Sequence, residues 1–389
     1  MRSTLFIILC FVLYVAVSCV DPFNPPVVES TTEYLVVDGI VDLADPEATI
    51  KLTRSMPLNG DQTPSQVQVV PGALVTIETE NGATFNLPEI SFGEYSAGGI
   101  SLDAGESCRL RIVLGGGEEY VSDPVTYKLS PPIDSVTWTS DGREVEFQVT
   151  THDAESDSRF YRWKVVETTM YSATFNSSLI WDPVLEEVRS RKPEEWIFYC
   201  WKTTPFSNIQ IYSTKGLAED AVVKRTVFTL PASSWKLALK YSLLVRQFTM
   251  DQSEYNFWTE LQKNTESIGT IFDPQPTQVT GNIRSVNPGR PNALGYFSVG
   301  RSVEKRIFVS VSNLPSPVGG YQRALPFCSP FEIDTIYMQE YMQSNKTALI
   351  INAVTNGGPA IIGYTSADTQ CIDCRQYHQG TNEQPDFWE

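Results

Sequence analysis

From Tyr34 onward, apolar and polar residues follow one another in short runs that turn residues separate. Residues 49–52 and 109–112 alternate strictly between polar and apolar side chains, and three consecutive glycines begin at Gly115. Such alternation predicts half-buried antiparallel strands, because successive side chains of a strand point to opposite faces. The strands predicted here cover residues 34–40, 48–53, 73–78, 84–87, 108–114 and 119–122. Their regular spacing predicts an immunoglobulin-like β-sandwich over residues 34–128.

Pro131 and Pro132 mark a boundary, since consecutive prolines break strand ladders and stiffen a linker. Strands predicted beyond them cover residues 135–139, 144–150, 159–168, 196–202, 208–213, 227–230, 239–248, 295–299, 306–311 and 349–353. Val145, Phe147 and Val149 share one face of the second of these strands, and the strands at 295–299 and 306–311 are predicted to return to the same sheet. A larger, mainly β domain is therefore predicted over residues 131–389.

One helix interrupts this β pattern. Ser253 follows Asp251 and is able to cap a helix, and Phe257, Trp258 and Leu261 fall on one face at helical spacing. We expect this aromatic stripe to belong to the core. The predicted fold class is mainly β, with an N-terminal immunoglobulin-like sandwich and one or two short helices in the larger domain.

The first 18 residues have the pattern of a secretory signal peptide, with Arg2 ahead of an apolar stretch and the small residue Ser18 at its end. Residues 16–19 resemble a bacterial lipobox, in which cleavage before Cys19 exposes a cysteine that is then acylated. A membrane-spanning anchor is an alternative, but the apolar stretch of about 13 residues falls short of the roughly 20 that a helix needs. Secretory cleavage at another position is a second alternative. We expect lipidation at Cys19.

Residues 19–33 read as a tether between the lipid and the folded chain. Pro22, Pro25 and Pro26 lie among few core-forming residues, which predicts an extended segment. Two or three acyl chains make membrane attachment effectively permanent. The predicted location is a membrane, and residues 20–24 hold no clear acidic cluster that would decide which of its faces the protein occupies.

Composition and charge narrow the class of protein. Hydrophobic residues make up 41% of the 389 residues and charged residues 19%, so burial can offset chain entropy and a folded body is expected. The chain carries 29 Lys and Arg against 46 Asp and Glu, a net charge of −17. Nucleic acid is excluded as a partner, because binding a phosphate backbone depends on clustered Lys and Arg.

Five cysteines remain besides Cys10 in the leader and Cys19. In an exported protein they are first of all disulfide candidates. We expect Cys371 and Cys374 to bridge back to Cys200 and Cys328, with the pairing left open, and Cys108 to be a buried thiol. Such bridges would tie the C-terminal tail to its domain. Two alternatives remain for Cys371 and Cys374: zinc binding together with His378, or a redox dithiol.

The sequence contains no recognisable catalytic motif. The two histidines, His152 and His378, lie outside any nucleophile elbow, metalloprotease helix or phosphate loop. Carboxylates in residues 150–157 suggest a calcium site as the alternative to a solvated turn, but their order does not match an EF-hand. A pair of carboxylates for glycoside hydrolysis stays open, since 46 acidic residues make chance pairs inevitable. We predict no catalytic residue, no metal and no cofactor.

Aromatic residues are dense in the second domain. Trp181, Trp196, Tyr199 and Trp201 are candidate binding residues, because exposed aromatic rings stack on sugars or anchor protein interfaces. Core packing is the alternative, although alternation over residues 196–201 places aromatic rings on both faces of the predicted strand. Residues 134–136 and 334–336 resemble a bacterial O-glycosylation pattern, with ordinary strand-edge residues as the alternative.

Ten different short motifs follow one another along the chain. They are the Ser18-Cys19 site with the Asp and Pro residues after it, 35–39 (LVVDG), 71–77 (PGALVTI), 131–136 (PPIDSV), 255–258 (YNFW), 271–276 (IFDPQP), 281–283 (GNI), 294–297 (LGYF), 371–375 (CIDCR) and 385–388 (PDFW). Together they resemble a Bacteroidota lipoprotein family of unknown function, domain of unknown function 4249. The resemblance implies an outer-membrane lipoprotein, often encoded beside a TonB-dependent transporter, and transfers no catalytic residue.

These observations lead to one expected function and two alternatives. We expect a non-catalytic outer-membrane lipoprotein that acts as an accessory or cargo-binding subunit of a TonB-dependent barrel. An adhesion or envelope-scaffold lipoprotein is the first alternative. A carbohydrate-active enzyme is the second.

Overall fold

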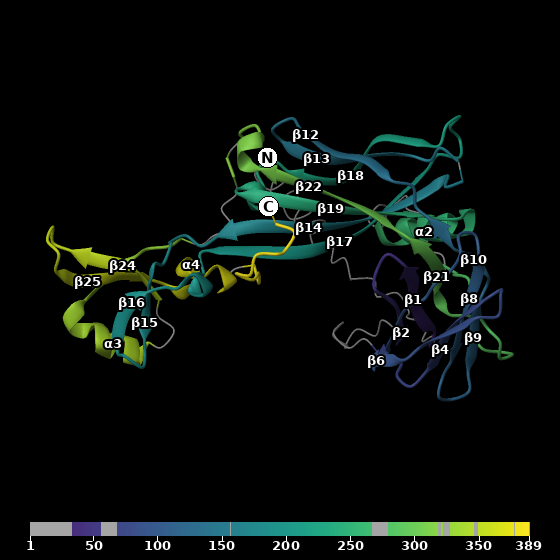
Figure 1. Cartoon of the computed structure of the whole chain (residues 1–389), viewed down its shortest axis with the longest axis horizontal. Coiled ribbons are helices and arrows are strands. Elements are labelled where there is room, and N and C mark those ends of the chain that lie inside the picture. Colours follow the sequence, from purple (N-terminus) through teal and green to yellow (C-terminus); the bar gives the residue numbers. More distant parts are fainter. Residues whose placement is uncertain are drawn as a thin grey trace, which may run out of the picture.

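The computed structural model describes residues 33–55, 68–155, 157–266, 279–317, 320–321, 327–345, 349–376 and 378–388. The predicted signal peptide over 1–18, the lipidation site Cys19 and the tether up to residue 32 lie outside these ranges. The described chain is mainly β, as predicted, with short helices. Three lobes follow one another, as Figure 1 shows. No helix in the described ranges is long and apolar enough to span a membrane.

The first lobe is a two-sheet sandwich. Its strands are β1 (Leu35–Asp42), β2 (Glu47–Arg54), β3 (Gln68–Val69), β4 (Leu74–Thr79), β5 (Thr84–Leu87), β6 (Glu89–Ser91), β7 (Glu94–Gly98), β8 (Ser107–Val113), β9 (Glu119–Ser122), β10 (Val125–Thr126), β11 (Lys128–Leu129), β20 (Ile283–Ser285) and β21 (Leu294–Arg301). One sheet has the order β11-β21-β1-β2-β7-β6 and the other β20-β9-β8-β4-β5. Alternating residues such as Ile50, Ile77 and Leu110 are fully buried between the sheets. The predicted sandwich is confirmed.

Two strands of this sandwich come from the second half of the chain. β21 runs parallel to β1, with Val36 opposite Leu294, and β20 pairs with β9. The prediction that 295–299 and 306–311 lie in the same sheet is wrong, because the second segment joins a sheet of the central lobe. The division into 34–128 and 131–389 changes accordingly, since residues 283–301 pack with the sandwich. Alternation reveals a strand and its buried face, but it does not name the neighbouring strand.

Two glycines let β21 approach its neighbours closely. Gly295 has a φ of +110°, and a Cβ there would lie 2.0 Å from the carbonyl oxygen of Val37. A Cβ on Gly281 would lie 1.5 Å from the carbonyl oxygen of Gly295. Any side chain at either position would displace the backbone, so only glycine fits.

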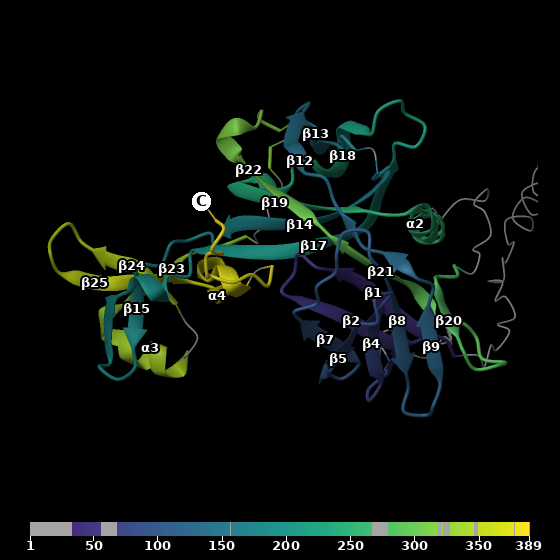
Figure 2. The ribbon, with the colours of Figure 1, turned by 45° about the vertical axis from the view of Figure 1, so that its right-hand side comes forward.

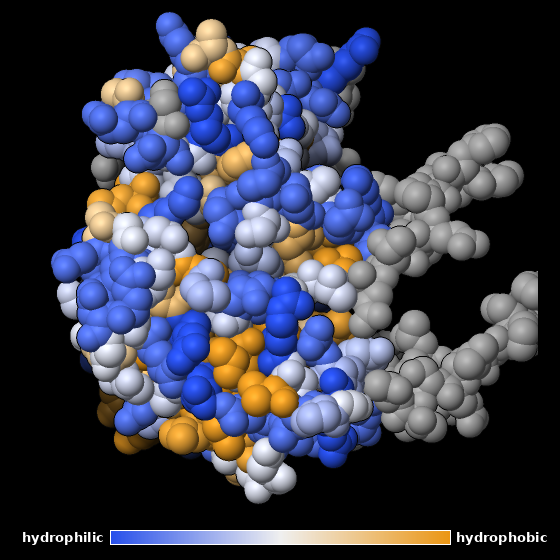
Figure 3. Space-filling view, turned by 90° about the vertical axis from the view of Figure 1, so that its right-hand side faces the viewer, coloured by the Kyte–Doolittle hydropathy of each residue, from blue (hydrophilic) through white to orange (hydrophobic). Residues whose placement is uncertain are grey.

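The surface at the sandwich end is mainly hydrophilic, with separate hydrophobic patches among the polar residues (Figure 3). Large apolar side chains of the sandwich that are exposed include Val69, Leu74, Ile90 and Phe92. Phe92 lies in the turn between β6 and β7.

The central lobe packs a three-stranded sheet against a four-stranded one. Its strands are β12 (Ile133–Ser140), β13 (Glu144–His152), β14 (Phe160–Ser172), β17 (Tyr199–Ser213), β18 (Ala221–Pro231), β19 (Lys240–Thr249) and β22 (Val303–Ser310). The orders are β12-β13-β18 and β17-β14-β19-β22. Val145, Phe147 and Val149 are fully buried in the core between the sheets. The runs predicted at 196–202 and 208–213 fall largely on the single strand β17.

Helix α2 (Gln252–Glu266) follows β19 and lies beside the central lobe near the sandwich (Figure 1). Its cap is Asp251, whose Oδ1 accepts hydrogen bonds from the Glu254 backbone N–H and the Ser253 hydroxyl, both at 2.7 Å. The predicted cap residue, Ser253, thus donates to the actual cap.

The aromatic stripe of α2 is not part of a core. Phe257, Trp258 and Leu261 are only half-buried. The Phe257 ring contacts the ring of Tyr296 at 5.1 Å, and Trp258 lies under the Arg162 guanidinium at 4.4 Å. The predicted core role is wrong, because helical spacing shows that residues share a face but not how deeply that face is buried.

The third lobe, here called the distal lobe, lies beyond the ends of β14 and β17, away from the sandwich (Figures 1 and 2). Its sheet has the order β16-β15-β24-β25-β23. These strands are β15 (Leu179–Asp182), β16 (Glu187–Ser190), β23 (Phe331–Asp334), β24 (Leu349–Thr355) and β25 (Ile361–Ala367). Helix α3 (Met338–Ser344) packs Met338 and Met342 against Ile350, and α4 (Thr369–Ile372) packs Ile372 against Ile351. Ile350 and Ile351 therefore belong to separate hydrophobic clusters, each with one of the two helices.

Candidate functional site

Two disulfides join the C-terminal segment to the rest of the chain. They pair Cys200 with Cys374 and Cys328 with Cys371. The four predicted cysteines are confirmed as disulfide partners, and the pairing that the sequence left open is now assigned. The zinc and dithiol alternatives are wrong, because Cys371 and Cys374 bind different partners. Cys108 is a buried free thiol, as expected, and burial raises its pKa to about 12.

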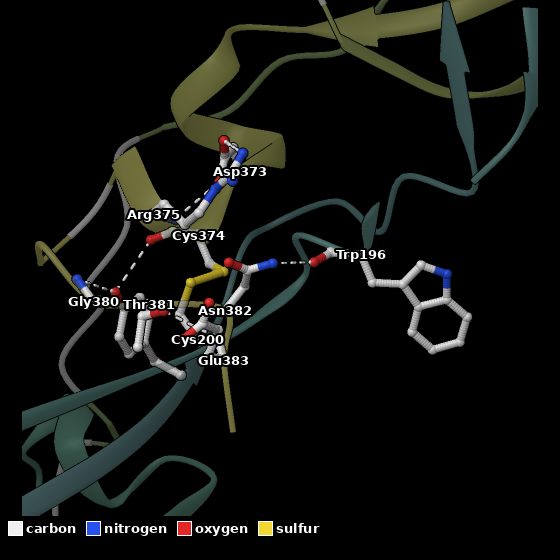
Figure 4. Close-up of a disulfide and its surroundings, with 10 residues drawn as sticks. Trp196, Cys200, Asp373, Cys374, Arg375, Gly380, Thr381, Asn382 and Glu383 are labelled. Carbon is white, nitrogen blue, oxygen red and sulfur yellow. Dashed lines mark hydrogen bonds and ion pairs between the residues drawn. A yellow bond between two sulfur atoms is a disulfide. The ribbon is translucent and has the colours of Figure 1, made fainter. Parts of the chain in front are cut away.

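The Cys200–Cys374 disulfide fastens the C-terminal tail onto β17, as Figure 4 shows. Thr381 exchanges two backbone hydrogen bonds with Trp201, at 2.8 and 2.9 Å. The Asn382 side chain donates to the carbonyl oxygen of Trp196 at 2.9 Å (Figure 4). The tail thus covers part of the edge strand β17, which would otherwise present unpaired backbone groups.

The four candidate binding aromatics do not form one site. Trp196 is 61% exposed and Tyr199 is 43% exposed. Trp201 is buried beneath the tail, with its ring 6.3 Å from that of Trp388. Trp181 is half-buried on β15 in the distal lobe. Of the four, only Trp196 and Tyr199 offer largely exposed rings, and they lie three residues apart at the start of β17.

An ion-paired turn holds the backbone before Trp196. Residues 193–195 form a short 3₁₀ helix, and the Arg189 guanidinium binds Glu195 at 2.7 Å and Asp182 at 3.0 Å. The hydrogen bonds from Arg189 lower the pKa of Glu195 to about 2. With the turn fixed on one side and Asn382 on the other, the Trp196 ring extends outward, away from the disulfide (Figure 4).

Two ion pairs lie on the segments that meet at this end of β17. Arg375 binds the buried carboxylate of Asp373 at 2.8 Å, and Arg189 binds Glu195. Exposed aromatic rings suit a sugar ring or another apolar face, onto which such rings stack. We call Trp196 and Tyr199 the aromatic pair.

The other sequence candidates lie apart from the aromatic pair. His152 bonds Asp134 at 2.8 Å on β12 and β13. Asp153 accepts hydrogen bonds from the backbone N–H of Asp157 and from the hydroxyl of Ser158. Its carboxylate therefore stabilises the local turn. Within the described ranges, no group of three or more His, Cys, Asp or Glu residues is placed to hold a metal ion.

Sequence reasoning missed the exposed apolar residues of the distal lobe, among them Val184 and Ile336. The available signal was the apolar pair at 184–185, directly after Asp182 and Pro183, where a hairpin turn ordinarily carries polar residues. Four of the five strands in this lobe were not predicted, so Val184 and Leu185 could not be recognised as the turn of a hairpin.

Comparison with known proteins assigns the family. The family described as "Domain of unknown function (DUF4249)" matches residues 20–306. The chain belongs to this family. For the motifs between residues 20 and 306, DUF4249 membership confirms the resemblance seen in the sequence. Strands β23 to β25 and both cysteines of the CIDCR motif lie beyond the range matched by DUF4249.

Other comparisons add little to the DUF4249 assignment. No curated protein matches the chain. A solved two-domain fibronectin type III segment from chicken tenascin is similar at 14% identity, over 56% of this chain and 90% of its own. Its TM-score is 0.15.

Proposed function

We propose that this chain is a non-catalytic outer-membrane lipoprotein, lipidated at Cys19, that acts as a cargo-binding accessory subunit of a TonB-dependent transporter. The observation that supports binding is the aromatic pair, Trp196 and Tyr199, exposed on backbone that a disulfide and an ion-paired turn hold in place. A backbone that is already held in place loses little freedom when a ligand binds, which favours affinity.

The arrangement of the lobes agrees with an anchored binding protein. The described chain enters the sandwich at Glu33, whereas the aromatic pair lies at the junction between the central and distal lobes. A lipid at residue 19 would confine the pair to the vicinity of the membrane. Confinement raises the effective concentration of the pair at a partner in the same membrane, so weak contacts suffice.

Co-purification tests the transporter partner. The full-length protein is expressed in its own cell with a C-terminal tag, the membrane is dissolved in mild detergent, and the captured complex is identified by mass spectrometry. We expect a TonB-dependent barrel in stoichiometric amounts. Repeated recovery without any barrel would contradict the proposal.

Uptake by variants tests the aromatic pair. A double variant, Trp196→Ala with Tyr199→Ala, should retain the barrel but lose cargo retention, because the stacking surface is gone. Phe92→Ala removes an exposed ring from the sandwich and serves as the control. Equal cargo retention by the two variants would remove the aromatic pair from the proposal.

An envelope-scaffold role is the second candidate, and the succession of three lobes away from the chain entry favours it (Figures 1 and 2). A strain that lacks the protein distinguishes the scaffold role from the transporter role. Normal nutrient uptake with lost attachment or envelope integrity would favour the scaffold. Turnover of a glycan by the purified protein, abolished by single Asp or Glu substitutions, would instead favour a carbohydrate-active enzyme.

A further inference from the structure

Large apolar side chains gather on the surface of the distal lobe. Val184, at the turn between β15 and β16, is 87% exposed, and Leu185 beside it is also exposed. Ile336 is 81% exposed and adjoins the exposed Tyr337 in the 3₁₀ turn before α3. Single exposed apolar residues are ordinary on a protein surface, but several in one area mark an interaction site.

Hydrogen bonds show that these residues lie side by side. Glu186, next to Leu185, accepts a hydrogen bond from the Gln339 side chain of α3 at 2.7 Å. The Thr335 hydroxyl donates to the carbonyl oxygen of Ile362 on β25 at 3.4 Å. The hairpin turn, the turn before α3 and the start of β25 therefore adjoin. We define the distal apolar surface as Val184, Leu185, Ile336, Tyr337, Ile361 and Ile362.

A pocket of about 590 Å³ adjoins this surface. Trp181, Met342 and Ile350 supply apolar walls, and Pro183 and Glu186 of the hairpin turn line it as well. A concave apolar pocket of this size takes a bulky apolar group. At protein interfaces, an aromatic or aliphatic side chain inserted in such a pocket supplies much of the affinity.

Carboxylates that form no described salt bridge lie within a few residues of the distal apolar surface along the chain. The exposed acidic residues of this lobe are Glu186, Glu187, Glu332, Asp334 and Glu340, and no salt bridge engages them within the described ranges. Of the arginines on the same lobe, Arg189 binds Asp182 and Glu195. Arg191 lines the pocket and donates to Ser177 and to the Glu195 carbonyl, while its Nη2 is buried without a hydrogen-bond partner among the described residues. The surface is therefore apolar with an acidic surround.

We propose that the distal apolar surface docks a protein partner that inserts an aromatic or aliphatic side chain into the pocket and places Lys or Arg residues opposite the surrounding carboxylates. Opposite charges around an apolar centre steer association and select the partner. This inference does not depend on the transporter proposal, since it concerns other residues and any partner of this chemistry.

Two other occupants fit the charges poorly. In a two-fold dimer of this chain the same surface would face itself, which brings acidic residues against acidic residues in a protein of net charge −17. An anionic lipid surface would be repelled for the same reason. A basic protein partner meets both the apolar and the electrostatic requirement.

Defined peptides test the proposal with purified full-length protein. Three fluorescent 12-residue peptides are compared by anisotropy: a Trp-Leu core flanked by Lys, the same core flanked by Glu, and a Ser core flanked by Lys. We expect the first to bind at least tenfold more tightly than either of the others. Leu185→Asp should weaken it at least tenfold, whereas Val223→Asp, at a 73% exposed apolar position on β18, should leave it unchanged.

Thermal unfolding of the two Asp variants tests whether both are folded. Equal affinity for the Lys-flanked and Glu-flanked peptides, or full binding by the Leu185→Asp variant, would overturn the proposal. Analytical sedimentation tests for a second copy of the chain on the surface, and vesicle binding tests for lipid. A dimer that Leu185→Asp abolishes would assign the surface to a second copy, and Leu185-dependent binding to phosphatidylglycerol vesicles would assign it to lipid; either result overturns a protein partner.

Discussion

Arg246 on β19 binds Asp42 on β1 across the junction between the central lobe and the sandwich, with Nη1 3.3 Å from Oδ2. The same guanidinium binds Asp45 at 2.8 Å and also contacts Glu304. Asp42 is buried, and its other oxygen accepts a hydrogen bond from the backbone N–H of Ser302 at 2.9 Å. One arginine thus links three carboxylates from two lobes.

Removing this cation should destabilise the junction. In Arg246→Met the buried Asp42 carboxylate loses its partner, so we expect the free energy of unfolding in urea to fall by about 3 kcal/mol. Arg284→Met is the matched control, because Arg284 and Asp123 form a pair in which both side chains are exposed. Its effect should stay below about 1 kcal/mol. Similar losses in the two variants would show that Arg246 does not hold the lobes together.

Two tryptophans close in sequence should respond in opposite ways to truncation. Trp201 is buried beneath the tail, so Trp201→Ala should cost about 3 to 5 kcal/mol of unfolding free energy. Trp196 is exposed, and Trp196→Ala should change stability by less than about 0.5 kcal/mol. Urea unfolding measures both. A large loss in the Trp196 variant would mean that this ring packs against protein and is not free to bind cargo.

The two disulfides should contribute unequally to stability. Cys200 and Cys374 are 174 residues apart and Cys328 and Cys371 are 43 apart, so chain entropy gives about 5 kcal/mol for the first bridge and about 4 kcal/mol for the second. Double Cys→Ala variants of each pair are compared by urea unfolding. Limited proteolysis should release the tail first from the variant that lacks the Cys200 bridge. The reverse order of cleavage would contradict the fastening role of that bridge.

The two histidines should give stability opposite dependences on pH. Burial, with smaller contributions from Lys202 and Lys236, lowers the pKa of His378, which stacks on Trp235 at 3.7 Å. Its contribution is complete above the unfolded pKa near 6.5 and declines as the pH falls below that value. The hydrogen bond to Asp134 raises the pKa of His152, so its contribution is complete below 6.5 and is lost as the pH rises through the folded pKa.

Urea midpoints at pH 5.5 and 7.5 separate these effects. Relative to the unsubstituted protein, His378→Gln should gain stability at pH 5.5 compared with pH 7.5, and His152→Gln should show the reverse. The same pH response in both variants would contradict the assigned environments.

The alternation of apolar and polar residues was sufficient to predict a strand where every second residue of that strand is buried. Burial largely alternates along β1, β2 and β8, and each of these strands was predicted. The distal lobe was largely missed, because strands such as β15 and β16 are four residues long and carry no clear alternation. The partner of β21 was also missed, since its contact with β1 depends on residues far apart in the chain.

The candidate site could also be predicted only in part. Cysteine count and compartment pointed to Cys200, Cys328, Cys371 and Cys374, because few other pairings were possible. The exposure of Trp196 and the burial of Trp201 were not predictable, since the tail that covers Trp201 arrives from residue 381. The exposure of these two rings depends on a segment far away in the chain, which the local pattern at residues 196–201 does not contain.

The parallel pairing of β1 with β21 has a consequence for synthesis of the chain. Val36 meets Leu294 across a loop of roughly 260 residues, which raises contact order and slows folding. A nascent chain therefore carries an open edge on β1 until residue 301 has been made. Such an edge is a template for any free strand, including the β20–β21 segment of a neighbouring molecule. Crowded synthesis would then yield strand-swapped dimers, and dilution during refolding should suppress them.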